Sequence, residues 1–185
     1  MSQSYPSSMF PATFVGGAAG LWRVERQEVV RGDGLPLVER LDVQPGHAAV
    51  TGAWSLRGVA GHVRYVERRE KEHLDPVSPA LARSEAMLAA FIPIRKSAAW
   101  WALPQDERRA ILEQRSRHIS DTLKYLPRIA RRLYHARELG ESFDFLTWFE
   151  FAPEHASAFD ELVEMLRSRE EWTFVEREVE LRLSR

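Results

Sequence analysis

The six histidines of this sequence, together with its carboxylates and tyrosines, are the side chains that could hold a metal, because the chain contains no cysteine. They are His47, His62, His73, His118, His135 and His155. No two of them are four residues apart and no His-Glu-x-x-His motif occurs, so the sequence encodes no helical zinc-hydrolase site. The lack of cysteine also excludes disulfides, iron–sulfur clusters, thiolate nucleophiles and covalently attached c-type haem. A single histidine that binds iron through a macrocycle is still permitted, since haem needs only one or two protein ligands.

Other catalytic motifs are absent as well. The sequence contains neither a glycine-rich phosphate-binding loop nor the Gly-x-Ser-x-Gly turn that carries a nucleophilic serine. Its 26 basic and 27 acidic residues give a formal net charge of -1, which argues against a large binding surface for nucleic acid or anionic membranes. With 44% apolar and 29% charged residues, the 185-residue chain has the composition of a soluble globular protein. Its length suits one compact domain or two small fused halves.

No segment of the chain predicts export or insertion into a membrane. The residues before Arg23 include no lysine or arginine and are interrupted by Pro6, Pro11 and several glycines, so they do not form a signal peptide. The longest clean apolar stretch elsewhere, residues 86–94, is too short to cross a bilayer. We therefore expect a cytoplasmic protein that binds neither membranes nor nucleic acid.

The second half of the chain has the clearer pattern of secondary structure. Residues 91–94 predict a short edge strand, because Pro93 cannot donate a hydrogen bond to a central ladder. A helix is expected to begin near Pro104 and to end at Pro127.

Three further elements are expected after this helix. The strand-like segments 129–137 and 143–151 predict a hairpin, whose aromatic second strand we interpret as barrel core. Alternating apolar residues from 173 to 183 predict a closing strand. Between them, Pro153 begins a helix with an amphipathic face formed by Phe159, Leu162, Val163 and Leu166.

The order of these elements predicts an α+β fold built from two ferredoxin-like halves. Residues 91–185 have the order strand, helix, strand, strand, helix, strand, which is that of a ferredoxin-like unit. Residues 1–90 are expected to form a shortened version of it, an inference from element order since the sequence contains no repeat. Breaks at 31–34 and 44–46 separate its strand-like segments. These segments are residues 14–30, 48–57 and 63–68. Two such sheets pack face to face or join into a barrel whose inner surface can hold a ligand.

Several segments of the second half closely resemble the chlorite dismutase family. They are Ile-Arg-Lys-Ser-Ala-Ala-Trp-Trp at 94–101, His118, Tyr-Leu-Pro-Arg-Ile-Ala-Arg-Arg-Leu-Tyr-His at 125–135, Asp-Phe-Leu-Thr-Trp-Phe-Glu at 144–150, and Arg-Glu-Glu-Trp-Thr-Phe-Val-Glu-Arg-Glu-Val at 169–179. The first half matches more loosely, at 56–58 and 64–66. The short chain without a leader is similar to the dimeric branch of this family. The resemblance implies a homodimer with a dimeric α+β barrel fold and haem b as cofactor.

The resemblance assigns His118 as the iron ligand on the proximal side of the haem and Glu171 as its carboxylate partner. Without the flanking match, His118 would be interpreted as an ordinary helix histidine. As a ligand it would be neutral and would donate its second ring nitrogen to Glu171, which makes the ring more electron-donating. The adjacent Glu170 is equally acidic, and only the register of the match distinguishes the two glutamates.

Arg131 matches the arginine that the family directs into the distal haem cavity, where a forked guanidinium can hold a small oxyanion. In a strand, Arg131 and Arg132 face opposite sides, so Arg132 is the competing assignment if the register slips. Lys96, Trp100 and Trp101 match the family's pattern on the proximal side and near the haem propionates. Tyr65 is similar to a tyrosine that contacts a propionate.

The function that the resemblance implies is a haem b chlorite dismutase, which converts chlorite to chloride and dioxygen by forming an O–O bond. Arg131 would keep hypochlorite in the cavity until that bond forms. Coproheme decarboxylation is an alternative, although relatives with that activity usually lack the distal arginine and have longer chains. A non-catalytic haem-binding sensor or carrier is a third possibility. Oxygen evolution from chlorite on an electrode would distinguish them.

Overall fold

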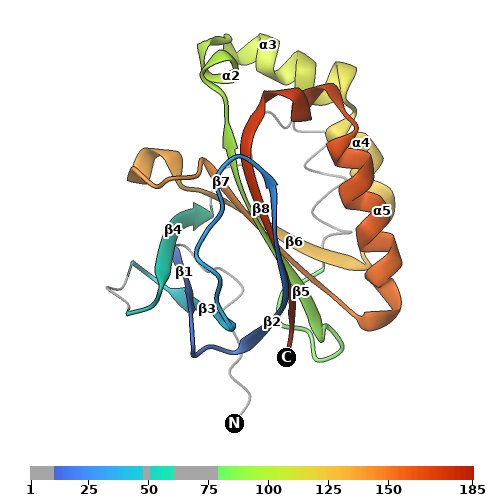
Figure 1. Ribbon diagram of the computed structural model, residues 1–185. Helices are drawn as coiled ribbons and strands as arrows, with labels where there is room; N and C mark the ends of the chain where they lie inside the picture. The colour runs from blue at the N-terminus through green and yellow to red at the C-terminus, as the bar shows by residue number, and fades with distance from the viewer. Residues whose placement is uncertain (1–10, 48–50, 61–78) are drawn as a thin grey trace.

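The structure is a computed structural model that describes residues 11–47, 51–60 and 79–185. Within these residues, antiparallel strands close into one barrel in the order β1-β3-β2-β8-β5-β7-β6-β4, and β4 pairs with β1 (Figure 1). The strands are β1 Ala12–Gly17, β2 Trp22–Arg31, β3 Arg40–Pro45, β4 Trp54–Ala60, β5 Leu88–Lys96, β6 Ile129–His135, β7 Phe145–Phe151 and β8 Val175–Ser184.

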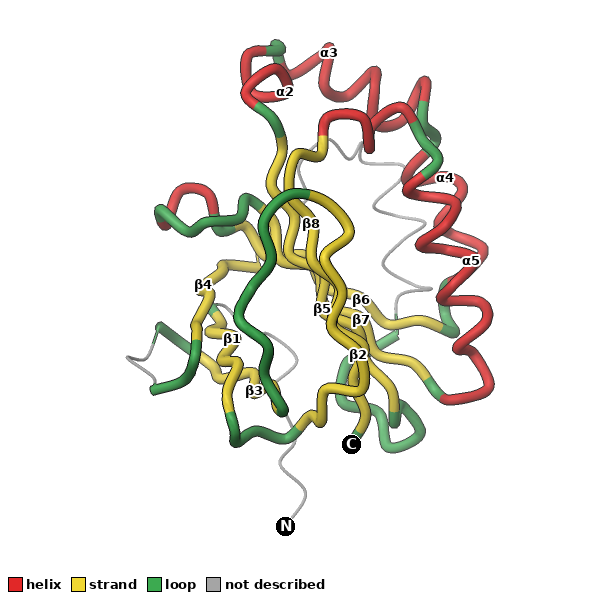
Figure 2. The backbone as a smooth tube through the Cα atoms, in the orientation of Figure 1, coloured by secondary structure: helices red, strands yellow, loops and turns green. Residues whose placement is uncertain are grey.

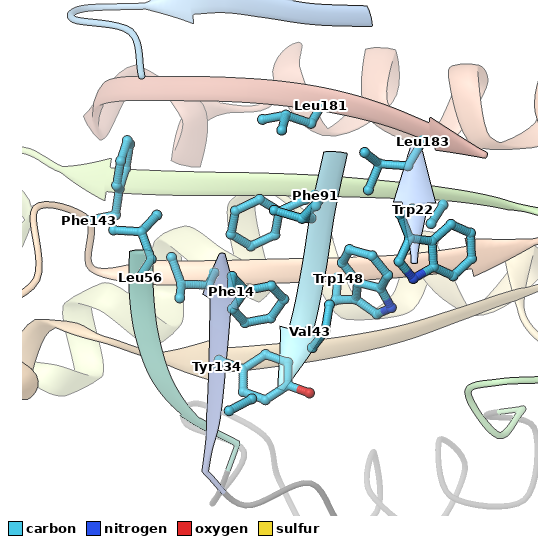
Figure 3. Close-up of a cluster of buried hydrophobic side chains, with 14 of the residues drawn as sticks. Phe14, Trp22, Val43, Leu56, Phe91, Tyr134, Phe143, Trp148, Leu181 and Leu183 are labelled. Atoms are coloured by element: carbon cyan, nitrogen blue, oxygen red, sulfur yellow. The ribbon is translucent and has the colours of Figure 1, made fainter. Parts of the chain in front are cut away.

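Aromatic side chains fill the inside of the barrel. Phe14 of β1 stacks on Phe91 of β5 with ring centroids 4.4 Å apart, and the ring of Tyr134 meets Phe14 edge-on at 5.1 Å (Figure 3). Trp22 and Trp148 continue the cluster with a centroid distance of 5.5 Å. Side chains alternate between the two faces of each strand, so every second residue along a strand contributes to this core. The interpretation of residues 143–151 as barrel core is confirmed for Trp148.

Helices cover the outer face of the second half of the barrel (Figures 1 and 2). Helix α5, Ala156–Arg167, follows the single 3-10 turn η4, Pro153–His155, as Pro153 predicted. Its buried Phe159 packs on Phe149 and Phe151 of β7. The predicted apolar face is confirmed, since its members are buried against the outer side of the sheet. They are Phe159, Leu162, Val163 and Leu166.

The helix expected from Pro104 to Pro127 begins as predicted, since Pro104 is the N-cap of α3, but it is not a single helix. The stretch is divided into α3 Gln105–Arg109, the π-helical turn η1 Ala110–Arg115, α4 His118–Thr122 and the 3-10 turn η2 Leu123–Tyr125, and the short helix α2 Ala98–Ala102 precedes it. The division before α4 has a backbone cause: Arg117 adopts a left-handed conformation with φ 51° and ψ 35°, which no helix can pass through. The remaining 3-10 turns are η3 Arg137–Leu139 and η5 Glu170–Phe174.

The expected edge strand at 91–94 is also wrong, because β5 is nine residues long and lies between β7 and β8. Pro93 aligns with Leu146 of β7, whereas the pairing with β8 is interrupted between Phe91 and Ile94. The proline therefore occupies a central strand at a point where its missing N–H is not needed by the β8 ladder.

The first half differs from its prediction in two places. The strand expected at 14–30 is two strands, separated at residues 18–21. Strand β3 was not predicted, because the break at 44–46 was interpreted as a loop although Leu41 and Val43 point into the core. The predicted strand at 63–68 and residues 48–50 of the strand at 48–57 lie outside the described residues, and β4 covers the rest of the latter from Trp54 onward.

The second half runs β5, helical segment, β6, β7, α5, β8, and its strands lie in the order β8-β5-β7-β6. The closing strand is confirmed as β8, although it begins at Val175 after η5. None of the helices within 11–47, 51–60 and 79–185 has the length and hydropathy needed to cross a membrane.

The junction between β2 and β3 is short. These two strands pair only at Trp22↔Leu41 and Arg23↔Arg40. The pairing of β4 with β6, at Val59↔His135 and Ala60↔Tyr134, continues to the last described residue of β4. Strand β3 is therefore joined to β2 by limited hydrogen bonding.

Candidate functional site

The centre of the candidate site is a hydrogen-bonded pair formed by His118 at the start of α4 and Glu171 in η5. His118 Nδ1 lies 2.7 Å from Glu171 Oε2, and the Glu171 side chain is buried whereas that of His118 is 20% exposed. A carboxylate acceptor fixes the proton on Nδ1, so Nε2 is left as the ring nitrogen with a free lone pair. Metal-binding histidines have this arrangement, in which the second nitrogen donates to a carboxylate.

Lys96 at the end of β5 completes the pair from the other side. Its Nζ lies 2.9 Å from Glu171 Oε1 and also donates to the Glu171 carbonyl oxygen at 3.3 Å, and both side chains are buried. Burial alone would raise the pKa of Glu171, but its interactions with His118 and Lys96 outweigh burial and hold this pKa at about 2. Glu171 is therefore a carboxylate anion over the whole physiological pH range.

Glu170, the competing glutamate, has a different environment. Its side chain is 43% exposed and forms an ion pair with Arg115 at 3.0 Å. The structure thus brings Glu171, and not Glu170, to His118.

Lys96 is held in place by its backbone and by an aromatic ring. Its N–H donates to the buried Asp144 at 2.7 Å, and Asp144 also accepts from Trp101 Nε1 at 3.0 Å. The Lys96 ammonium lies 4.6 Å from the ring centroid of the buried Trp100, which packs on Phe174. Lys96 thus contacts both Trp100 and Glu171, and in this way connects Trp100 to the His118–Glu171 pair. The contact with a haem propionate that the sequence suggested for Lys96 and Trp100 stays a prediction.

Arg131 extends from the outer face of β6, the face on which the helices lie. It aligns with Phe149 of β7 and alternates with Ile129, and both of these pack in the outer core. Burial lowers the pKa of Arg131, although a guanidinium stays protonated. Within the described residues, its side chain has no hydrogen bond or ion pair. Arg131 is therefore a partly buried cation that no carboxylate of the described chain neutralises.

Arg132, the competing arginine, lies on the opposite face of β6. It aligns with Trp148 and is adjacent to Tyr134, both of which point into the barrel. The register of β6 thus separates the two arginines, and only Arg131 shares the outer face with Lys96.

Lys96 and Arg131 lie at different ends of that outer face. Arg131 aligns across Phe149 with Ala90 of β5, six residues before Lys96. At about 3.4 Å per residue, the two cations are separated by roughly 20 Å along the strands. Lys96 therefore serves the histidine pair, whereas Arg131 is free to serve a different group.

The residues of this face fit a haem. Within the described part of the chain, no group of three or more metal-ligating side chains occurs, so an iron held by His118 needs most of its ligands from a macrocycle. Leu133, which alternates with Arg131, is 42% exposed and Val59 on the neighbouring strand is 36% exposed. Exposed apolar side chains next to a cation are suited to a flat apolar ring with charged substituents.

Tyr65, the remaining candidate for the cofactor site, lies outside the described residues, as do His62 and His73. Two residues around His118 were not singled out from the sequence. They are Ser116, whose Oγ accepts from Glu171 N at 3.1 Å, and Glu113, which accepts from backbone groups of α4. Both residues accept hydrogen bonds from backbone N–H groups. Such contacts follow no sequence spacing by which they could have been recognised.

Fold and site together define an α+β barrel protein with a carboxylate-supported histidine on the outer side of its sheet. The family model for chlorite dismutase matches residues 37–185. The chain belongs to the chlorite dismutase family.

Similar proteins agree with this membership. A curated chlorite dismutase from Ideonella dechloratans is 34% identical over 98 residues, which are 52% of this chain and 33% of that protein, so the chain spans about a third of that relative. The structure of a dimeric chlorite dismutase from Nitrobacter winogradskyi is 56% identical, with a TM-score of 0.90, and the match covers 94% of this chain and 99% of that chain. A mutant chlorite dismutase from Candidatus Nitrospira defluvii is 20% identical, with a TM-score of 0.66 over 97% of this chain and 92% of that chain, and supports the fold alone.

Proposed function

We propose that the protein binds haem b and converts chlorite to chloride and dioxygen. The observation that carries the proposal is the His118–Glu171 pair, in which a 2.7 Å contact occupies Nδ1 and leaves Nε2 for an iron. The position of Arg131 on the same outer face of the barrel supports it, as does family membership.

His118 is the residue that would hold the iron, through Nε2. Glu171 orients the ring by accepting from Nδ1 and increases the electron density that the ring can donate. Lys96 keeps Glu171 ionised, and Trp100 packs against the Lys96 ammonium. Tyr65 and Trp100 are proposed as contacts of the haem propionates on the resemblance alone.

Bound haem b would supply a redox-active iron at which an oxyanion can coordinate and exchange oxygen. The conversion of one chlorite ion to one chloride ion and one dioxygen molecule conserves atoms and charge. It therefore needs no proton donor, external reductant or second substrate, and the task left to the protein is to hold an anion. Arg131 is suited to this task because its planar guanidinium offers five N–H donors at a fixed charge. We propose that it keeps the chlorine oxyanion in the site until the O–O bond has formed.

The test is oxygen evolution by the haem-reconstituted protein after addition of chlorite, recorded with the absorption spectrum. Wild-type protein should release oxygen and keep its haem spectrum over many turnovers. Arg131→Ala should still bind haem, but its turnover should fall by roughly tenfold to a hundredfold, the value of a hydrogen bond to a charged group, and its haem should bleach sooner. Arg131→Lys keeps the charge without the fork and should be intermediate.

A matched control is Arg23→Ala on β2, which removes a strand arginine whose side chain is 64% exposed. This variant should behave as wild type. Unchanged oxygen yield and haem lifetime in Arg131→Ala would contradict the role of that residue. Haem binding without oxygen release by the wild type would contradict the activity itself, and incubation with coproheme and peroxide would then test decarboxylation.

The quaternary structure, the domain organisation and the location are also proposals. We propose a homodimer, supported by the neighbour described as dimeric, and sedimentation analysis would test it. We propose that residues 91–185 are a ferredoxin-like haem-binding half and residues 1–90 a shortened one, supported for the former by the strand order β8-β5-β7-β6. The cytoplasmic location stays a prediction that cell fractionation would test.

A further inference from the structure

We propose that Glu113 is a positioning residue for His118. Its carboxylate takes the place of an N-cap on α4 and thereby fixes the helical turn from which the histidine extends. The inference rests on the proposed role of His118 as the iron ligand, and it assigns no contact between Glu113 and the cofactor.

The first turn of α4 has N–H groups that need acceptors, and Glu113 supplies both of its oxygens. Ile119 N donates to Glu113 Oε2 at 2.7 Å, and Ser120 N donates to Glu113 Oε1 at 3.2 Å. These are the second and third residues of the helix, the positions that an N-cap side chain normally satisfies. The N-cap residue here is Arg117, which cannot accept a hydrogen bond. A carboxylate is also favoured at the positive end of a helix.

The backbone between Glu113 and His118 makes this contact possible. In the π-helical turn η1, Ser116 N donates to Ile111 O, five residues earlier, at 3.0 Å. Arg117 then adopts a left-handed conformation that is unfavourable for a residue with a side chain. The helical backbone is interrupted there, and the Glu113 carboxylate lies over a turn that begins five residues after it. Insertions of this kind in helices are frequent at functional sites.

The same stretch is attached to the segment that carries Glu171. Ser116 Oγ accepts from Glu171 N at 3.1 Å, and Asp121 on α4 forms an ion pair with Arg169 at 2.6 Å. The backbone of Glu171 and the end of α4 are thus fixed by contacts between segments. Glu113 fixes the beginning of α4, next to His118, by a contact within one segment. Both partners of the His118–Glu171 hydrogen bond therefore have a fixed backbone.

Loss of the Glu113 carboxylate should make the position of His118 less fixed, while the protein as a whole stays folded. Glu113→Ala leaves the N–H groups of Ile119 and Ser120 to water and allows the first turn of α4 to fray. Loss of a helix cap corresponds to roughly a fivefold to tenfold change in an equilibrium constant. We expect amide exchange at these two residues and haem dissociation from the holoprotein to become faster by about that factor.

The experiment compares Glu113→Ala, Glu113→Gln and the control Glu161→Gln, which removes an exposed carboxylate from α5. Hydrogen exchange is measured on cofactor-free protein, and haem dissociation on holoprotein by transfer to an excess of apomyoglobin. The iron–histidine vibration of the reduced holoprotein, recorded by resonance Raman, reports the histidine directly. Glu113→Gln retains one acceptor oxygen and should recover part of the loss, and Glu161→Gln should match wild type in all three measurements.

Three results would overturn the proposal. Unchanged exchange at Ile119 and Ser120 in Glu113→Ala would show that there is no cap. Faster exchange with unchanged haem dissociation and an unchanged iron–histidine band would show a cap that does not position the ligand. If wild-type protein takes up no haem, the proposed function and the positioning role both fail, and the exchange data still show whether Glu113 caps α4. Glu113→Gln serves all of these comparisons if Glu113→Ala does not fold.

Discussion

Replacement of Glu171 by glutamine would remove the charge at the centre of the site while keeping its shape. Lys96, which is 5% exposed, would then be a buried ammonium without its anionic partner. Removal of one member of a buried ion pair costs about 3–5 kcal/mol of folding free energy, because the remaining charge is left uncompensated. The double variant Glu171→Gln with Lys96→Met has no buried charge at this point, and should lose only about 1 kcal/mol or less relative to wild type.

The assay is urea denaturation of the cofactor-free protein for wild type, both single variants and the double variant, which form a double-mutant cycle. The cycle should give a coupling energy of roughly 5 kcal/mol or more between the two side chains. The pH dependence provides an independent check. The folded pKa of Glu171, about 2, lies below its ordinary value of 4.5, so the advantage of wild type over Glu171→Gln is complete above pH 4.5 and decreases as the pH falls towards 2.

The reasoning would be refuted if Glu171→Gln unfolded at the same urea concentration as wild type, or if the double variant lost as much stability as both single variants together. Either result would mean that Lys96 and Glu171 do not depend on one another in the folded protein. The same variants loaded with haem would also show a higher reduction potential for Glu171→Gln, because the ring of His118 then donates fewer electrons to the iron.

Three further predictions concern other parts of the molecule. His118→Ala should fold, as judged by circular dichroism, but should lose the five-coordinate haem spectrum; a normal high-spin ferric spectrum would contradict its role as ligand. Burial opposes ionisation of Glu180, but hydrogen bonding to Arg182 and the charge of that residue lower the pKa of Glu180, so its contribution to stability is present above pH 4.5 and lost as the pH falls below it. Urea midpoints at pH 7 and pH 3 should therefore differ less in Glu180→Gln than in wild type. Gly58→Ala would place a methyl group 2.6 Å from Cβ of Tyr134 inside the barrel, and thermal unfolding should show a loss of about 1–3 kcal/mol.

Local patterns in the sequence were sufficient for helix α5 and for the hairpin β6–β7. Helix α5 shows its apolar residues at helical spacing, and the hairpin shows two strand-like segments on either side of a connection that contains η3. Pro93 was misleading because the rule that excludes proline from central strands assumes an unbroken ladder on both sides. The left-handed conformation of Arg117 could not be predicted, since arginine gives no local preference for it.

In the candidate site, too, the sequence predicted residue types, whereas their contacts depend on the tertiary structure. The choice between Glu170 and Glu171, and between Arg131 and Arg132, depends on the face to which each residue points, which the structure resolves through contacts with distant segments. Glu113 was not predicted because its partners are backbone N–H groups, and a carboxylate five residues before a helix does not match the spacing of a capping box.

The limited pairing between β2 and β3 has a consequence for how the molecule opens. Segments with few hydrogen bonds to the rest of a protein exchange with partly unfolded states more readily than the remainder. Strand β3 is joined to β2 at two residue pairs, whereas β8, β5, β7 and β6 are paired along their lengths. Partial unfolding should therefore begin with the separation of β3 from β2, and the sheet that carries Lys96 and Arg131 should remain folded as a platform for the cofactor.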